Sequence, residues 1–195
     1  MNEADRTVVA ALAALRAALS EIGAPHMLIG GTAVILRGVA RVTDDLDATV
    51  WAERLEIGDV LATLMRHGIV ARIPDAEEFA RTRHVLLLRH DETGTPVDLS
   101  LAWLPFEQDA LARAEIIEIE HVQMPVALAQ DLVVYKAVAW RDRDRTDIER
   151  LMRAHAREID FAYVRRMVRE FADALGEPER VEEFERLLAR VSGQR

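Results

Sequence analysis

The sequence of 195 residues contains no cysteine. This absence excludes disulfide bonds, a thiol nucleophile and thiolate metal ligands, and it fits a reducing cytoplasm. No apolar run reaches the ~20 residues that a membrane-spanning helix needs. The first residues also lack the basic and apolar pattern of a secretory signal. We therefore expect a cytoplasmic protein without a membrane segment.

Basic residues are fewer than acidic ones: the sequence has 25 Lys and Arg and 34 Asp and Glu, which gives a net charge of −9. An acidic balance argues against a surface that is one broad nucleic-acid footprint. It permits a local basic patch, and it suits a site that collects divalent cations. Half of the residues are hydrophobic, which is enough for an ordinary globular core.

The order of the expected elements changes along the chain. Strands and helices alternate first, and only helices follow residue 128, which predicts an α+β fold. We expect a small mixed β-sheet with flanking helices over residues 1–125 and a helical region over residues 126–195 that packs on the active-site cleft. Apolar periodicity predicts strands at 26–29, 45–50, 69–73, 84–90, 95–102 and 115–120, the last at a sheet edge, and helices at 3–22, 32–36, 53–67, 75–82, 128–140, 143–156, 160–175 and 178–191.

A glycine pair, Gly30-Gly31, stands between an expected strand and an expected helix, with Thr32 directly after it. Glycines let the backbone approach a phosphate closely, and free N–H groups at a helix start attract anions. Taken alone, a tight turn without any ligand explains the pair better.

Three aspartates stand on expected strands. Asp45 and Asp47 are two residues apart and therefore point to the same face of their strand. Two neighbouring carboxylates repel each other unless a cation lies between them, and Mg²⁺ prefers such oxygen ligands. Asp98 interrupts an apolar strand, and on a neighbouring strand it would be the third ligand of a two-metal site. The alternatives are a solvated strand face for the pair and a water-facing edge strand for Asp98.

Together these residues resemble the signature of the polymerase-β-like nucleotidyltransferase superfamily. That signature is a Gly-Gly turn, a short gap, Asp-hydrophobic-Asp and a later acidic strand. The stretch from Gly30 through Arg41-Val-Thr43-Asp-Asp45-Leu-Asp47 is most similar to the AbiEii-type branch, which includes toxins of toxin–antitoxin systems. The resemblance places Arg41 and Thr43 in register with its nucleotide-binding motif.

The second half of the chain supports the same resemblance. Its family pattern of Asp-Leu, a helical Lys and paired acids matches Lys136, Asp144 and Asp147. The resemblance implies that Lys136 meets the triphosphate and that the two acids belong to the nucleotide site. The spacing of Lys136, Arg143 and Asp147 would also place them on one helical face. The alternative is a solvated, salt-bridged helix start, capped by Asp144 or Asp142.

The resemblance implies a magnesium-dependent transferase that moves an NMP from ATP or another NTP to a hydroxyl group. Asp45, Asp47 and Asp98 would hold two metal ions, Lys136 would act with them, and Gly30, Gly31, Thr32, Arg41, Thr43, Asp144 and Asp147 would bind the nucleotide. The expected acceptor is RNA, such as a tRNA end, or a protein, and the chain could be a toxin with an antitoxin partner. Two alternatives stay open: a small-molecule acceptor such as an aminoglycoside, and an inactive nucleotide-binding or interaction protein.

Overall fold

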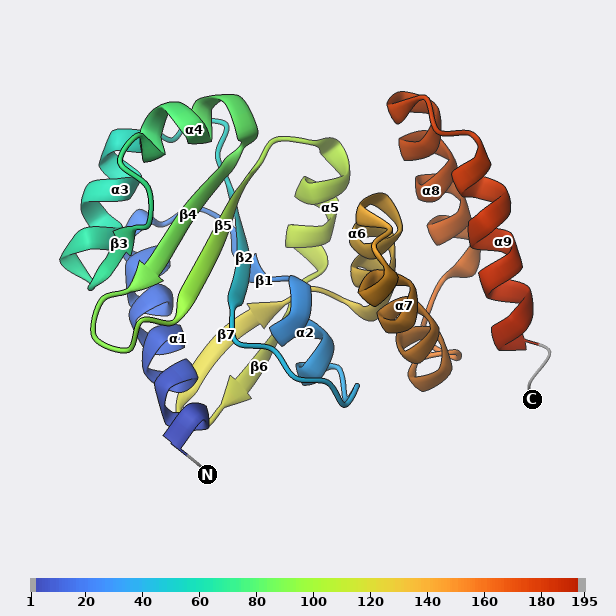
Figure 1. Ribbon diagram of the computed structural model, residues 1–195, viewed down its shortest axis with the longest axis horizontal. Helices are drawn as coiled ribbons and strands as arrows, with labels where there is room; N and C mark the ends of the chain where they lie inside the picture. Colours follow the sequence, from blue (N-terminus) through green and yellow to red (C-terminus); the bar gives the residue numbers. More distant parts are fainter. Residues whose placement is uncertain (1–2, 193–195) are drawn as a thin grey trace. The chain divides into compact units, whose positions relative to one another are not determined.

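The computed structural model describes residues 3–192 of the chain (Figure 1). Its contacts divide the chain into two compact units. The sheet unit comprises the described residues up to 33 and residues 42–127, and the helical unit comprises residues 34–41 and the described residues from 128 onward. The expected boundary after residue 125 lies close to the division between residues 127 and 128. The assignment of residues 34–41 to the helical unit was not anticipated.

The sheet unit is built on a seven-stranded mixed sheet with the order β3-β4-β5-β2-β1-β7-β6. Strands β2 and β5 run parallel, as do β1 and β7, and the other neighbours are antiparallel. The α+β class and the edge position of residues 115–119 are confirmed. The strands are β1 (His26–Leu28), β2 (Leu46–Trp51), β3 (Ile69–Ala71), β4 (Val85–His90), β5 (Pro96–Ala102), β6 (Glu115–Ile119) and β7 (Val122–Val126).

The burial of side chains largely alternates along the central strands, so one face of the sheet is more deeply buried than the other. Leu46, Ala48 and Val50 of β2 are fully buried, and so are the positions of β5 and β4 that share their face. Of the intervening positions, Thr49 and Ala102 are also buried, whereas Asp47, Asp98 and Leu87 are half-buried. Among them, Asp47 pairs in register with Asp98, which in turn pairs with Leu87 of β4. Two of the three predicted acidic residues therefore stand side by side on the half-buried face.

Helices complete the sheet unit, and α1 supplies its apolar stripe through the fully buried Leu15 and Leu19. Helix α1 packs on α3 and contacts β2, β3 and β7. Helix α5 was missed, although Pro105 in its first turn and the Glu107 carboxylate, which accepts the N–H groups of residues 103 and 104, are recognisable start signals. Strand β7 was missed as well. The helices are α1 (Glu3–Ile22), α2 (Gly30–Leu36), α3 (Ile57–Arg66), α4 (Ala76–Arg83) and α5 (Pro105–Arg113), of which residues 34–36 of α2 group with the helical unit.

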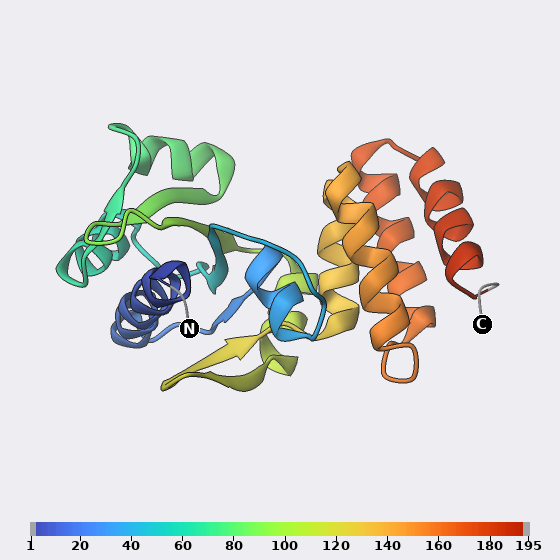
Figure 2. The same ribbon diagram turned by 60° about the horizontal axis from the view of Figure 1, so that its bottom comes forward.

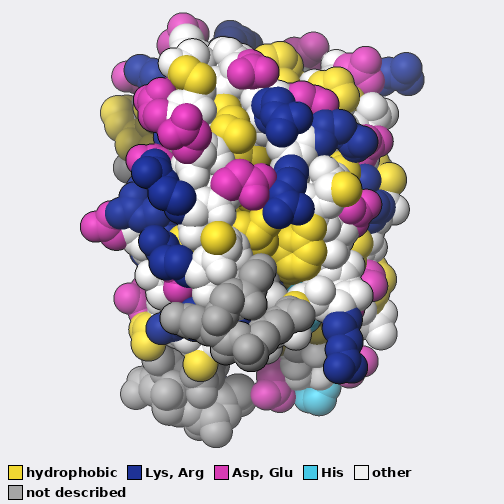
Figure 3. Space-filling model, turned by 90° about the vertical axis from the view of Figure 1, so that its right-hand side faces the viewer, with side chains coloured by type: hydrophobic (Ala, Val, Ile, Leu, Met, Phe, Trp, Pro, Cys, Tyr) yellow, Lys and Arg dark blue, Asp and Glu magenta, His cyan; other side chains and the backbone are white. Residues whose placement is uncertain are grey.

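The helical unit contains α6 (Ala129–Ala139), α7 (Asp142–Ala154), α8 (Phe161–Leu175) and α9 (Glu179–Ser192). These helices lie side by side (Figure 2), with α6 against α7 and α8, and α9 against α7 and α8. Figure 3 shows acidic and basic side chains mixed over the face that carries α8 and α9. No helix within residues 3–192 is both long and apolar enough to cross a membrane.

A sharp break separates α6 from α7. Trp140 adopts a left-handed conformation with φ of 52°, and α7 starts two residues later. Arg180 of α9 donates hydrogen bonds to the carbonyls of Ala137 and Val138 at 2.8 and 3.0 Å, which satisfies the end of α6. The expectation that one helical face carries Lys136, Arg143 and Asp147 is therefore wrong, because the lysine lies on α6 and the other two lie on α7.

Candidate functional site

The Gly30-Gly31 turn is fixed against β2 by the main chain and by one carboxylate. Gly30 has a φ of +62°, and a Cβ atom added there would lie 1.9 Å from Oδ2 of Asp47. The N–H of Gly31 donates a hydrogen bond of 3.1 Å to that same oxygen, and the N–H of Ile29 donates one of 2.9 Å to the main-chain carbonyl of Asp47. Only glycine allows this approach, so the turn and the carboxylate are fitted to each other.

Two threonines hold Asp45 at the entrance to the same strand. The hydroxyl of Thr32 donates to the main-chain carbonyl of Asp45 at 3.0 Å, and the hydroxyl of Thr43 donates to its carboxylate oxygen Oδ1 at 2.5 Å. Thr32 is buried, whereas Thr43 and Asp45 are half-buried. The hydrogen bond from Thr43 fixes the orientation of the Asp45 carboxylate.

Asp98 stands beside Asp47 on the neighbouring parallel strand. Its Oδ1 forms an ion pair with Nη2 of Arg72, which directly follows β3. Burial raises the pKa of Asp98 above its ordinary value, the Arg72 guanidinium opposes that rise, and the negative charge of Asp45 adds to it. The influence of Asp45 shows that these acids share one electrostatic environment. Sequence reasoning missed Arg72, because an isolated arginine after a short strand carries no recognisable signal.

The donor set at these three positions fits a hard divalent cation, because carboxylate oxygens are the ligands that Mg²⁺ prefers. A glycine turn that leaves no room for a Cβ atom beside Asp47 is also suited to a close approach by a phosphate. Within residues 3–192, however, no three acidic or histidine side chains converge in the arrangement of a metal site. Asp98 is paired with Arg72, and Asp47 accepts a hydrogen bond from the N–H of Gly31.

The helical unit contains a second cluster of predicted residues, centred on Lys136. The lysine is 6% exposed, and its Nζ lies 3.1 Å from Oδ1 of Asp144 and 3.1 Å from Oδ2 of Asp147. Asp144 is fully buried and also accepts from the side chain of Arg141 at 2.7 Å. Nη1 of Arg41 lies 2.7 Å from Oδ2 of Asp147. The expected salt bridges at the start of α7 are present; the pair of Arg145 with Asp142 is exposed, whereas the pairs of Lys136 with Asp144 and Asp147 are buried.

The charges of this cluster compensate one another. Burial raises the pKa of Asp144, but the hydrogen bonds and positive charges of Arg141 and Lys136 outweigh it, so the pKa lies below its ordinary value. The carboxylate is therefore ionised at neutral pH. Removal of any one member of this cluster would leave a buried partner without its opposite charge.

Arg41 belongs to a segment, residues 37–41, that is tied to α7 and to the residue that follows it. Nη1 of Arg150 donates to the carbonyl of Ala40 at 2.9 Å, and Nε2 of His155 donates to the carbonyl of Arg37 at 2.7 Å. With the Arg41–Asp147 ion pair, these contacts explain why residues 34–41 group with the helical unit.

The predicted site residues thus fall into two groups. The sheet unit holds Gly30, Gly31, Thr32, Thr43, Asp45, Asp47 and Asp98, and the helical unit holds Arg41, Lys136, Asp144 and Asp147. In the helical unit, ion pairs connect all four residues. In the sheet unit, hydrogen bonds join Gly31 to Asp47 and both threonines to Asp45, while Gly30 and Asp98 lie beside Asp47.

A family model described as "nucleotidyltransferase of unknown function (DUF6036)" matches residues 9–190, and the chain belongs to this family. The superfamily predicted from the motifs is confirmed, whereas the AbiEii-type branch stays a prediction. None of the curated proteins matches the chain.

Solved structures share the fold at low sequence identity. The crystal structure of ANT(2″)-Ia in complex with adenylyl-2″-tobramycin has 20% identity and a TM-score of 0.53, and covers 84% of this chain and 95% of that one. The solution structure of the antibiotic-resistance factor ANT(2″)-Ia has 18% identity and a TM-score of 0.52, and the match covers 93% of this chain and 96% of that one. An antigenic nucleotidyltransferase-like protein from Paracoccidioides brasiliensis has 12% identity and a TM-score of 0.57, with 93% and 94% covered.

Proposed function

We propose that this nucleotidyltransferase uses Mg²⁺ and transfers an NMP from an NTP to a hydroxyl group of a small cationic acceptor. Asp45, Asp47 and Asp98 are the proposed metal-binding residues. The observation that carries this proposal is the fit between Gly30 and Asp47, because a glycine turn built around a carboxylate brings the main chain and an acidic group to one place. The strand register adds Asp98 beside them.

The bound metal would neutralise phosphate charge and lower the pKa of the attacking hydroxyl. The residues of the sheet unit prepare that environment. Thr43 and Thr32 position Asp45, and Gly31 positions Asp47. Arg72 compensates the charge of Asp98 in the structure described here. The main chain of the 30–32 turn is the proposed contact for the triphosphate.

Lys136 is proposed to act on the triphosphate, together with Arg41, Asp144 and Asp147. Its ammonium group is already paired with two carboxylates. Phosphate oxygens would therefore take the place of one carboxylate partner rather than meet an unpaired cation. Arg41 and Arg141 would compensate the carboxylate that the lysine leaves.

A small cationic acceptor is favoured over RNA by three observations. The likeness to ANT(2″)-Ia, whose complex contains adenylyl-2″-tobramycin, extends over nearly the full length of both chains. The arginines of α7 are also interleaved with acids, because Arg145 pairs with Asp142 and Arg153 pairs with Glu149. With a net charge of −9, the chain suits a cation better than a polyanion. RNA or protein transfer, a toxin role and an antitoxin partner stay predictions from the AbiEii-type resemblance.

Thermal stability with each NTP, in the presence and absence of Mg²⁺, tests the nucleotide and metal part of this proposal. An NTP at 100 times its Kd stabilises the folded state by about 2.7 kcal/mol. We expect one NTP to do so only with Mg²⁺, and Asp45→Asn to abolish the effect. Asp44→Asn is the matched control, because Asp44 is the exposed neighbour of Asp45.

Transfer of a labelled NMP identifies the acceptor. Tobramycin and related cationic aminocyclitols are compared with total tRNA and with a protein extract. Labelling of the aminocyclitol by the wild type and not by Asp45→Asn supports the proposal. Labelling of tRNA or protein would show that the acceptor is not a small cation, while the proposed NMP transfer would still hold. Transfer by Asp45→Asn at the wild-type rate would overturn the assignment of the site.

A further inference from the structure

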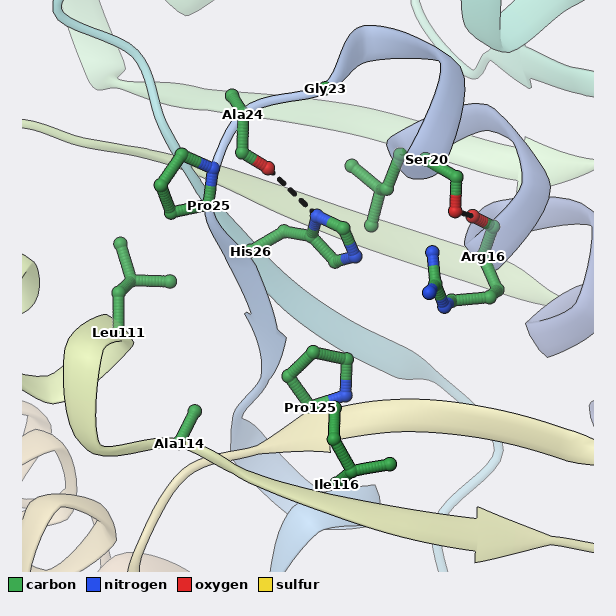
Figure 4. Close-up of a pocket in the computed structure, with 11 residues that line it drawn as sticks. Arg16, Ser20, Gly23, Ala24, Pro25, His26, Leu111, Ala114, Ile116 and Pro125 are labelled. Carbon is green, nitrogen blue, oxygen red and sulfur yellow. Dashed lines mark hydrogen bonds between the residues drawn. The ribbon is translucent and has the colours of Figure 1, made fainter.

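A pocket of about 490 Å³ lies in the sheet unit, where the end of α1, the start of β1 and the segment around β6 and β7 meet. Figure 4 shows His26 in the middle of this pocket, with Arg16 and Ser20 of α1 on one side and Leu111, Ile116 and Pro125 around the other. His26 pairs with Val50 at the far end of β2, whereas Asp47 lies near its beginning. The pocket is therefore distinct from the acidic site.

His26 offers a hydrogen-bond acceptor to this pocket. Its Nδ1 lies 2.8 Å from the carbonyl oxygen of Ala24. A carbonyl can only accept, so Nδ1 carries the proton and Nε2 of the neutral ring is an acceptor. Nε2 is buried and has no hydrogen-bond partner among residues 3–192. Burial lowers the pKa of His26, and the nearby Arg16 charge lowers it further, so the ring is neutral at pH 7.

Arg16 offers a cation to the same pocket. Its Nε donates to the carbonyl of Gln123 at 2.8 Å, which holds the guanidinium in place. No carboxylate of the described residues forms an ion pair with Arg16, although the chain as a whole is acidic. The two terminal amino groups remain for a ligand, and they form the fork that binds a carboxylate in a bidentate manner.

The rest of the pocket is apolar. Leu111, Pro125 and Ile116 line it, and Ile116 is 60% exposed. A single cation beside an apolar wall suits a monoanion with an apolar body, whereas a polyphosphate would need more positive charge than Arg16 provides. The volume lies within the range of small-molecule sites.

We propose that this pocket binds a small amphipathic carboxylate, with the carboxylate on Arg16, a hydroxyl donating to Nε2 of His26 and an apolar group against Leu111 and Pro125. Such a ligand would satisfy the one buried nitrogen and the one unopposed cation of the pocket together. This proposal is independent of the proposed metal-binding roles of Asp45, Asp47 and Asp98. Because His26 lies four residues before Gly30 in the sequence, the ligand would contact the strand that leads into the glycine turn.

Nuclear magnetic resonance of the ¹⁵N-histidine-labelled full chain tests this proposal with mandelate, which carries a carboxylate, a hydroxyl and a phenyl group. We expect a saturable shift of the His26 Nε2 signal, since this nitrogen accepts a new hydrogen bond. Phenylethylene glycol, which lacks the carboxylate, should bind at least ~10-fold more weakly. Phenylacetate, which lacks the hydroxyl, should bind without the Nε2 shift.

Arg16→Gln and Arg6→Gln form a matched pair on α1, since Arg6 is exposed and does not line the pocket. Arg16→Gln should weaken mandelate binding at least ~10-fold, whereas Arg6→Gln should leave it unchanged. Thermal melting of both variants verifies that they are folded. Absence of a His26 shift up to about 10 mM mandelate, or unchanged binding by folded Arg16→Gln, would overturn the proposal.

Discussion

Replacement of Gly30 by alanine tests the most specific feature of the candidate site. Gly30 has a φ of +62°, and a non-glycine residue in this conformation costs about 1–2 kcal/mol. The new Cβ atom would also lie 1.9 Å from Oδ2 and 2.3 Å from Cγ of Asp47. Ordinary contacts begin near 3.4 Å, so the carboxylate would have to move by about 1.5 Å or the turn would have to open.

That displacement should affect function more than stability. A shift of about 1 Å in a catalytic group costs on the order of 100-fold in rate. The same shift removes the hydrogen bond from the N–H of Gly31 to Asp47. We therefore expect Gly30→Ala to lower NMP transfer at least ~100-fold and to weaken Mg²⁺-dependent NTP binding, which is measured by calorimetry and needs no acceptor.

Gly94→Ala provides the matched control. Gly94 has a φ of +72°, and nothing lies within 4 Å of a Cβ atom added there. Both variants therefore share the conformational cost, which corresponds to a loss of about 2–8 °C in Tm. Only Gly30→Ala adds the collision with Asp47. If the two variants bind NTP and transfer NMP equally well, the idea that the turn positions Asp47 is refuted.

Three further predictions concern the charged groups. Lys136→Met should lower the free energy of unfolding by about 3–5 kcal/mol, because two buried acids lose their partner, whereas the exposed pair broken by Arg165→Met should cost less than about 1 kcal/mol. Equal losses in urea denaturation would contradict this. The lowered pKa of Asp144 means that its stabilising contribution is complete above the ordinary value of 3.8 and is lost as the pH falls through the lowered pKa. Asp144→Asn should therefore flatten the stability profile below pH 3.8, and a variant with the wild-type acid slope would refute the assignment. Arg72→Gln should lower the Mg²⁺ concentration needed for NTP-dependent stabilisation several-fold, because Asp98 loses its competing cation, whereas Arg89→Gln, at the exposed pair with Asp91, should not change it.

Much of the fold could be predicted because the elements carry their own local signals. The apolar stripe of α1 and the alternation in β2 and β5 depend only on nearby residues. Helix α5 was missed because its apolar pattern is weak, although Pro105 and Glu107 mark its start. Strand β7 is five residues long and contains Pro125, which is unfavourable inside a sheet.

The candidate site was predicted less completely, because the ion pairs of its acidic residues join residues that are distant in sequence. The positions of Asp45, Asp47 and Asp98 could be read from the motif, but the partner of Asp98 could not. Arg72 precedes Asp98 by 26 residues and reaches it through the order β3-β4-β5, which no local pattern specifies. The same applies to Arg41, which precedes its partner Asp147 by 106 residues.

The gap between the glycine turn and the aspartate motif has a structural reason. Thirteen residues separate Gly31 from Asp45, and a direct connection from the turn to β2 would not need them all. Part of this gap, residues 34–41, groups with the helical unit through Arg41, the Ala40 carbonyl and the Arg37 carbonyl. The chain therefore leaves the sheet unit after the glycine turn and returns to it before the aspartate motif. The same segment is held by α7, which carries Asp144 and Asp147, through the Arg41–Asp147 ion pair and the hydrogen bond from Arg150 to the Ala40 carbonyl. Residues 128–195 are thus no simple appendage, since their removal would leave Arg41 without Asp147 in the middle of the motif.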